Sequence, residues 1–207
     1  MFEQTLPGNT KTVLALLEKS ETIQKAYLAG GSALTLQLGH RISYDLDFFT
    51  REEFDEQKLL PEIDKISNFQ LEKIDWRTIL GKFGDVKFSI FYYEYPLLCV
   101  AKKFGMINVT DICDLAAMKI AAVASRGAKR DFVDIYFICK EGMSLKEIIH
   151  FYNEKYKNLA AVRTHILKSL VYFEDAESNE MPEMLKQANW EEVKKYLETE
   201  VKKLVNR

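Results

Sequence analysis

The sequence predicts an α+β fold, with a mixed β-sheet and flanking helices in residues 1–110 and a helical half in residues 111–207. Short segments rich in β-branched and aromatic residues all lie before residue 110. From Asp111 onward, apolar residues recur at helical spacing. A chain of 207 residues with 47% hydrophobic content can also bury a substantial core. We therefore expect a sheet domain followed by a helical domain.

The first predicted elements of the sheet surround a Gly-Gly-Ser turn. Tyr27–Ala29 is a short apolar run that is typical of a buried strand, and Gly30 and Gly31 break it. We expect Ser32 to be the N-cap of the helix that follows. Ser43–Phe49 then alternates polar and apolar residues, which indicates a second strand.

Further elements complete the sheet part. Thr50 and Glu53 match a capping box at the start of a helix. Leu71–Leu80 and Val86–Tyr93 are predicted to be consecutive strands that are joined by a glycine-containing turn. Met106–Val109 is predicted to be one more short strand. These strands would complete a mixed sheet.

The C-terminal half is predicted to consist of successive helices. Val162–Phe173 carries an apolar stripe, and Glu174–Pro182 has the composition of an exposed loop. Gly127 is expected to end the helix before it. Ser144 with Glu147, and Asn189, are expected to cap the starts of two later helices.

The Gly-Gly-Ser turn and the strand after it carry side chains suited to an anion and a cation. Glycines let the backbone approach an anion, and the N–H groups of a helix start favour negative charge. Strand alternation puts Asp45 and Asp47 on one face. Two carboxylates without a nearby His or Cys suit Mg²⁺. Each feature alone is most often a plain turn or a solvated strand end, but their order favours a phosphate and metal site.

A second group of charged residues lies on the predicted helices. Lys119 and Arg126 are two turns apart on one stripe of an alanine-rich helix. Such cations are either surface residues with buried stems or a pair that holds anionic oxygens, and the pattern alone leaves both open. Asp131 and Asp134 are one turn apart at the start of the next helix, where the helix dipole favours acids.

These motifs together resemble a known family. The Gly30-Gly31-Ser32 turn followed by Arg41–Phe49, RISYDLDFF, is similar to motif I of the DNA-polymerase-β-like nucleotidyltransferases, and in particular to the AbiEii/AbiGii-type abortive-infection toxins. Lys119, Arg126, and the Arg130-Asp131 pair with Asp134 resemble the third and fourth motifs of that family. The resemblance covers most of the chain.

The resemblance implies a Mg²⁺-dependent transfer of a nucleoside monophosphate from an NTP to an acceptor. Residues 1–110 would be the catalytic nucleotidyltransferase domain and residues 111–207 a helical domain. Asp45 and Asp47 would hold Mg²⁺, and Asp131 would act near the attacking or leaving oxygen. The residues expected to bind the nucleotide are Gly30, Gly31, Ser32, Arg41, Ser43, Lys119 and Arg126. Members act as toxins of type IV toxin–antitoxin pairs, some on the 3′ end of tRNA, which implies tRNA as acceptor and an antitoxin partner.

One position departs from the family pattern. Enzymes of this fold usually carry a third carboxylate on a later strand, and the best matching position here holds Ser89. Asp85 lies four residues away, roughly 13 Å along a strand, too far to replace it without a bend. A non-catalytic nucleotide-binding or regulatory module of the same fold is therefore an alternative. Another is an antibiotic nucleotidyltransferase with an aminocyclitol acceptor, which shares motif I.

Composition limits the classes of function. A net charge of −2 and a pI near 6.0 argue against nucleic-acid binding through bulk electrostatics. Cys99, Cys113 and Cys139 lie in apolar segments without metal-ligand spacing, so we expect reduced core thiols and a cytoplasmic protein. No segment has the character of a signal peptide, and Lys119 interrupts the longest apolar run, so no membrane partner is expected.

Overall fold

A computed structural model describes residues 1–66, 68–157 and 163–206. The helices, after a 3₁₀ turn at Glu3–Thr5, are α1 (Gly8–Leu17), α2 (Glu21–Lys25), α3 (Gly30–Leu38), α4 (Glu56–Asp64), α5 (Ile112–Arg126), α6 (Lys129–Lys140), α7 (Leu145–Lys155), α8 (Arg163–Ser169), α9 (Glu174–Glu177) and α10 (Trp190–Val205). The strands are β1 (Tyr27–Ala29), β2 (Leu46–Thr50), β3 (Phe69–Asp75), β4 (Thr78–Phe83), β5 (Val86–Tyr92), β6 (Lys102–Phe104) and β7 (Ile107–Val109).

The described strands form one mixed sheet in the order β3-β4-β5-β2-β1-β7-β6. β2 pairs with β5, and β1 with β7, in parallel, while the other neighbouring strands are antiparallel. The expected α+β fold with a mixed sheet is thus confirmed. Short β1 and β2 lie at the centre of the sheet, so their ends are surrounded by structure on both sides.

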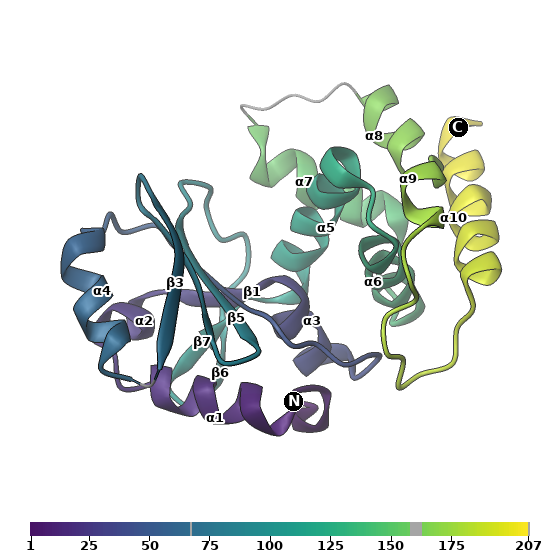
Figure 1. The fold of residues 1–207 in the computed structure, drawn as a ribbon. Helices are drawn as coiled ribbons and strands as arrows, with labels where there is room; N and C mark the ends of the chain where they lie inside the picture. Colours follow the sequence, from purple (N-terminus) through teal and green to yellow (C-terminus); the bar gives the residue numbers. More distant parts are fainter. Residues whose placement is uncertain (67, 158–162, 207) are drawn as a thin grey trace.

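The helices after residue 111 gather on one side of the sheet part (Figure 1). There α5 packs against α6, α7 and α8, and α3 contacts both α5 and α6. The change from sheet to helices falls between β7 and α5, at the predicted boundary. That the two parts are separate domains remains a prediction. Among the described helices, none has the length and apolar composition to span a membrane.

Side chains along β2 alternate between the hydrophobic core and the opposite face of the sheet, which carries Asp47. Leu46, Phe48 and Thr50 are buried on one face, and Asp47 and Phe49 are partly buried on the other. The apolar face belongs to the main hydrophobic core. β2 therefore presents its carboxylate on the face opposite to the core, as its sequence pattern predicts.

Several predicted helix boundaries are confirmed. Gly127 ends α5 in the left-handed conformation, at φ +56°. Ser144 and Glu147 form both hydrogen bonds of a capping box at the start of α7. Asn189 caps α10 by accepting from the backbone of Glu192. Each of these signals acts within one helical turn, which is why sequence alone locates them.

Other predictions were wrong where a second local interaction replaced the expected one. Helix α3 begins at Gly30, not after Ser32, because the chain turns directly at the end of β1. Asp55, and not Thr50, caps α4. The single strand expected over Leu71–Leu80 is a hairpin of β3 and β4, since Trp76 and Arg77 form a tight turn with Arg77 at φ +46°.

The segment after α9 returns to the sheet part. The expected exposed loop over Glu174–Pro182 contains the short helix α9, and the chain then runs back past the end of α3. There the backbone N–H of Ile42 donates to Glu183 O, and that of Leu185 donates to His40 O. We call residues 183–186 the return segment. The apolar stripe predicted for Val162–Phe173 is described only from Arg163, in α8, because Val162 lies outside the described residues.

Candidate nucleotide and metal site

A glycine pair places the start of α3 against the two aspartates. β1 pairs with β2 so that Ala29 lies opposite Asp47. Gly30 follows at φ +64°, and a Cβ atom there would lie 2.6 Å from Asp47 Oδ2. A Cβ atom on Gly31 would lie 2.8 Å from Ser43 Oγ. Side chains at these positions would therefore crowd Asp47 on one side and Ser43 with Arg41 on the other, at a helix start whose first N–H groups have no intrahelical acceptor.

The two aspartates form a site that fits a divalent cation. The Asp45 side chain is 32% exposed, and Arg130 Nη1 lies 3.8 Å from its Oδ2. Burial and the Asp45 charge raise the pKa of Asp47 above its ordinary value, and a hydrogen bond from Ser89 opposes them only in part. A cation bound to both carboxylates would offset this repulsion. Carboxylate oxygens are the ligands that Mg²⁺ prefers, so the residues present fit that ion.

Ser89 lies beside Asp47, where the family pattern leads one to expect a carboxylate. The parallel β2–β5 pair places Ser89 directly opposite Asp47. The Ser89 hydroxyl donates a 2.6 Å hydrogen bond to Asp47 Oδ1. Asp85, in contrast, lies in the exposed turn that precedes β5. The hydroxyl orients one oxygen of Asp47 but supplies no third negative charge.

Behind the aspartates lies a buried ion network, formed by Arg41, Lys119, Arg126, Asp131 and Asp134. Lys119 Nζ lies 2.8 Å from Asp131 Oδ1 and 2.6 Å from Asp134 Oδ2. Arg41 donates to both oxygens of Asp134, at 2.8 and 2.9 Å. Arg126 donates to both oxygens of Asp131, at 2.8 and 3.1 Å. The network thus joins the loop before β2 to α5 and α6.

The charges of this network do not cancel. Burial by itself would raise the pKa of Asp134, but Arg41 and Lys119 hold it well below its ordinary value. Lys119 and Arg126 likewise lower the pKa of Asp131 against the effect of burial. Burial lowers the pKa of His40, which also bonds to Asp134, and so favours its neutral form. Three cations therefore face two carboxylates, which leaves one positive charge in excess, and Arg126, 51% exposed, is the cation open to solvent.

The geometry changes the interpretation of several predicted site residues. Ser32 is fully buried, and its hydroxyl donates to the backbone carbonyl of Asp45, so it shapes the loop and is not open to a ligand. Arg41 is held by Asp134 beneath Gly31. Asp131 is fully buried with cations on both oxygens, so it is arranged to position Lys119 and Arg126 and not to accept a proton.

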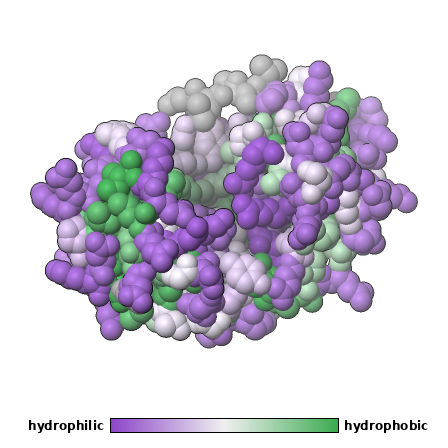
Figure 2. All heavy atoms as spheres, viewed as in Figure 1, coloured by the Kyte–Doolittle hydropathy of each residue, from purple (hydrophilic) through white to green (hydrophobic). Residues whose placement is uncertain are grey.

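A cleft of about 770 Å³ lies between the sheet and the helical part. Figure 2 shows the hollow between these two parts of the molecule. Both polar and aromatic side chains line the cleft. The polar ones include Asp47, Lys119, Ser125, Arg126 and His165, and the aromatic ones include Phe49, Phe91, Tyr93, Tyr152 and Tyr156.

A second cavity, of about 540 Å³, adjoins the first. Arg126 lines both, and Asp45 lines only the second. Strand alternation predicted Asp45 and Asp47 on one face; the two side chains line two adjoining cavities. The other charged residues that line the second cavity are Arg41, Arg130, Glu180 and Glu183. Two openings that meet at a pair of carboxylates can hold two different ligands.

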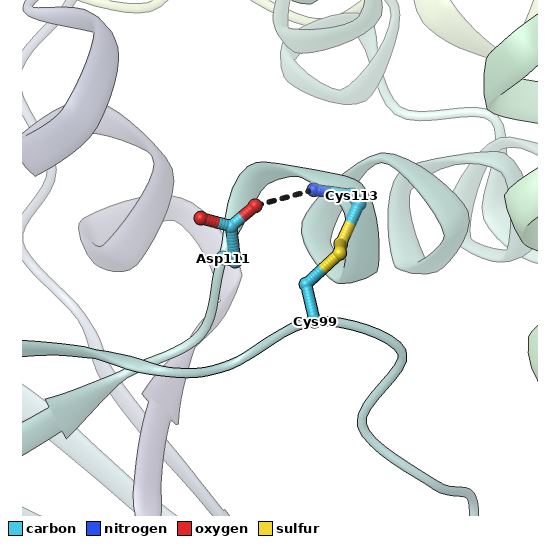
Figure 3. A group of neighbouring side chains, drawn as sticks. All are labelled: Cys99, Asp111 and Cys113. Carbon is cyan, nitrogen blue, oxygen red and sulfur yellow. Dashed lines mark hydrogen bonds between the residues drawn. A yellow bond between two sulfur atoms is a disulfide. The ribbon is translucent and has the colours of Figure 1, made fainter.

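The prediction of three reduced cysteines was wrong. Cys99 and Cys113 form a disulfide, with their Cα atoms 6.5 Å apart, whereas Cys139 is free and buried. The β6–β7 hairpin folds the chain back between them, and a spacing of 14 residues does not reveal this. Among the described residues, Cys99, Asp111 and Cys113 are the group of three donors close enough to hold a metal ion (Figure 3). In this structure the sulfurs of Cys99 and Cys113 are bonded to each other.

Sequence analysis missed two buried polar contacts. His40 bonds to Asp134 at 2.8 Å, and nothing beside His40 in the sequence indicates its burial. Lys155 and Asp114 form a fully buried ion pair at 2.6 Å. Helix α7 also carries Lys146, so nothing in its sequence marks Lys155 as the buried lysine, and the partner of Lys155 lies on another helix and cannot be identified from spacing.

Comparisons with known proteins show which family model and which solved folds the chain matches. Residues 12–98 and 92–204 match the family model described as nucleotidyl transferase AbiEii toxin, type IV TA system. An uncharacterized protein of Aquifex aeolicus (strain VF5) is 40% identical over 182 residues, covering 85% of this chain and 86% of that protein. A putative nucleotidyltransferase from H. pylori (TM-score 0.57, 17% identity) covers 100% of this chain and 98% of its own. The match to MenT4, a nucleotidyltransferase toxin from Mycobacterium tuberculosis H37Rv (TM-score 0.57, 13% identity), covers 95% of this chain and 86% of MenT4. The two solved structures show a shared fold.

Proposed function

The chain belongs to the AbiEii nucleotidyltransferase toxin family, and we propose that it transfers a nucleoside monophosphate from a Mg²⁺-bound NTP to an acceptor hydroxyl, with the 3′ end of tRNA as the acceptor. Residues 1–110 act as the catalytic domain, and residues 111–207 close over the nucleotide. The protein works as a toxin whose partner is a cognate antitoxin.

One observation carries the proposal: the open start of α3 lies beside a carboxylate pair and in front of a network with excess positive charge. Asp45 and Asp47 carry two negative charges, which one Mg²⁺ balances. The excess charge on the network then faces the anionic ligand through Arg126. Helix N–H groups, a cation and a guanidinium are the groups that bind a triphosphate in proteins.

The rest of the cleft suits the nucleobase. Its walls carry the rings of Phe49, Phe91 and Tyr93, with apolar Leu115 and Met118 from α5. Aromatic side chains stack on bases of any sequence. Lys119 lines the cleft from α5 and bonds to the phosphates while Asp131 and Asp134 fix its position.

In the proposed reaction the acceptor oxygen forms a bond to the α-phosphorus, and the bond from that phosphorus to the bridging oxygen breaks. Pyrophosphate leaves with the bond's electron pair, and the hydroxyl proton passes to solvent. When bound, Mg²⁺ neutralises charge that develops on the phosphate oxygens. Arg126 holds the transferring phosphate, and Ser89 orients Asp47. Because Ser89, and not a carboxylate, lies opposite Asp47 on β5, we expect slow turnover.

The second cavity argues for an anionic acceptor. Its lining carries three arginines, Arg41, Arg126 and Arg130, against three carboxylates, Asp45, Glu180 and Glu183. Mg²⁺ on Asp45 would shift this balance toward positive charge. With the metal bound, this lining favours the phosphodiester of an RNA end over a cationic aminocyclitol, the acceptor of the antibiotic-modifying alternative.

The test combines each α-labelled NTP with Mg²⁺ and total bacterial RNA. We expect label on RNA with the wild-type protein and none with Asp45→Asn, because the variant loses one metal ligand. Asp85→Asn is the matched control, since it removes an exposed carboxylate in the turn before β5 and should transfer at the wild-type rate. Equal transfer by wild type and Asp45→Asn would contradict the metal role.

Ser89 favours one other function, a nucleotide-binding module without catalysis. Calorimetric titration separates the two. If the protein binds NTP only with Mg²⁺ but transfers no label to any acceptor, the module is correct. If Asp45→Asn binds Mg²⁺ and NTP as tightly as wild type, both functions fail, because each assigns the metal to this aspartate.

A further inference from the structure

The disulfide joins the segment that follows β5 to the start of α5, and both contribute residues to the cleft lining. Residues 93–101, which we call the β5–β6 segment, begin at Tyr93, a residue of the cleft wall. Cys99 lies near the end of this segment, and Cys113 is the second residue of α5. Lys119 follows six residues later on α5, about 9 Å along the helix. The crosslink therefore connects the sheet side of the cleft to the helix that carries its central cation.

Noncovalent contacts hold the same segment to the same helices. The backbone N–H groups of Leu98 and Cys99 donate to Asp114 at 3.0 Å. Lys155 donates to Pro96 O at 2.7 Å and to Asp114 at 2.6 Å. These bonds can also form when the disulfide is open, although the segment is then held less firmly. Opening the disulfide would thus loosen the segment without unfolding it, and would leave the two sulfurs near enough to rejoin.

The surroundings of the two sulfurs differ in a way that suits reversible exchange. Cys99 is partly exposed, so an external thiolate can reach its sulfur, while Cys113 is buried, with 3% exposed. Cys113 lies in the first turn of the 15-residue helix α5, whose N-terminal end favours an anionic leaving sulfur. The neighbouring carboxylates are neutralised, since Asp111 pairs with Lys102 at 2.9 Å and Asp114 with Lys155.

We propose that Cys99 and Cys113 are a redox-active pair that, when oxidised, locks the β5–β6 segment onto the start of α5 and thereby makes the cleft rigid. A dithiol reductant attacks the Cys99 sulfur, the bond to Cys113 breaks, and the Cys113 thiolate takes up a proton. The second thiol of the reductant then releases Cys99 and forms the reductant's own disulfide. Two electrons and two protons pass to the protein, and a small-molecule disulfide such as oxidised glutathione reverses the change.

The amides of Leu98 and Cys99 report directly on this lock, because they donate to Asp114 only when the segment is seated. Hydrogen exchange of the β5–β6 segment is measured by mass spectrometry in the oxidised and the reduced protein. A crosslink of this loop length restricts opening by a factor of roughly a hundred, so we expect exchange about ten to a hundred times faster after reduction. Intact mass and thiol labelling in denaturant count the thiols: one when oxidised, three when reduced.

Two variants separate the lock from a general loss of stability. Cys99→Ser should exchange like the reduced wild type in either redox buffer. Cys139→Ser, which alters a buried thiol outside the pair, should keep the wild-type response. Three reactive thiols in protein equilibrated with oxidised glutathione would overturn the proposal, and so would equal exchange of the segment in the oxidised and reduced states. Neither readout requires nucleotide, so the result is independent of the proposed function.

Discussion

Asp134 is the residue whose replacement tests the buried ion network most directly. The substitution Asp134→Asn keeps the shape of the side chain but removes its charge. The carboxylate is fully buried and contacts Arg41 at 2.8 Å, Lys119 at 2.6 Å and His40 at 2.8 Å. Without it, three cations would face Asp131 alone. Removing one partner from a buried ionic group costs about 3–5 kcal/mol.

That loss converts into a measurable shift of the melting temperature. For a chain of this size, about 1 kcal/mol shifts Tm by roughly 2–4 °C, so we expect Tm to fall by about 6–20 °C. Circular dichroism during heating, with urea unfolding at 25 °C, measures both quantities. Asp64→Asn is the matched control, because it makes the same chemical change at an exposed position at the end of α4. It should leave Tm nearly unchanged.

The same substitution has a defined pH dependence. Because the folded pKa of Asp134 lies well below its ordinary value of 3.8, the folded state binds this proton more weakly than the unfolded state. The carboxylate therefore stabilises the fold above pH 3.8, and this contribution disappears as the pH falls through the lower, folded pKa. The gap in stability between wild type and Asp134→Asn should narrow only below pH 4. A gap smaller than about 1 kcal/mol at pH 7 would refute the assigned role of the network.

Three more substitutions test the site. Asp47→Asn should raise the Tm of metal-free protein at pH 7, because the folded pKa of Asp47 lies above its ordinary value and the ionised carboxylate therefore destabilises the fold. The same substitution should abolish the rise in Tm that Mg²⁺ causes in the wild type. An unchanged Mg²⁺ effect in a melting assay would exclude Asp47 as a ligand. Gly31→Ala should weaken NTP binding in calorimetry, because its Cβ would lie 2.8 Å from Ser43 Oγ, whereas Gly8→Ala, in open space, should not. Ser89→Asp should raise label transfer by about two to four orders of magnitude if the missing carboxylate limits the rate; slower transfer would show that the hydroxyl itself is needed.

How far the sequence predicts this molecule depends on how far apart the interacting residues are. The strand Tyr27–Ala29, the end of α5 at Gly127 and the capping box at Ser144 each follow from neighbours within one turn. The adjacency of Gly30 and Asp47 is also accessible, because it needs only the pairing of two consecutive strands. These short-range relations fixed the outline of the site.

Long-range contacts decided the remaining roles. Arg41 was expected at the nucleotide, but it is bound by Asp134, 93 residues away, and no local pattern specifies that pairing. Asp131 has the position of a first-turn helix acid, and only the folded chain shows both its oxygens in contact with cations. The disulfide required the hairpin of β6 and β7 to bring its two halves together. In each case the sequence shows the chemical type of the residue but not the distant residue that it contacts.

The return segment has a consequence for when the protein becomes competent during its synthesis. Its backbone hydrogen bonds hold His40 and Ile42, which lie in the loop that leads to Asp45 and Asp47. A growing chain that has left the ribosome only as far as the sheet lacks these bonds, because the residues that make them are translated long after the strands. We therefore expect nascent chains and fragments that stop before Glu183 to form the sheet but to leave this loop unfixed. Such a delay would keep the proposed activity silent until the return segment has been synthesised.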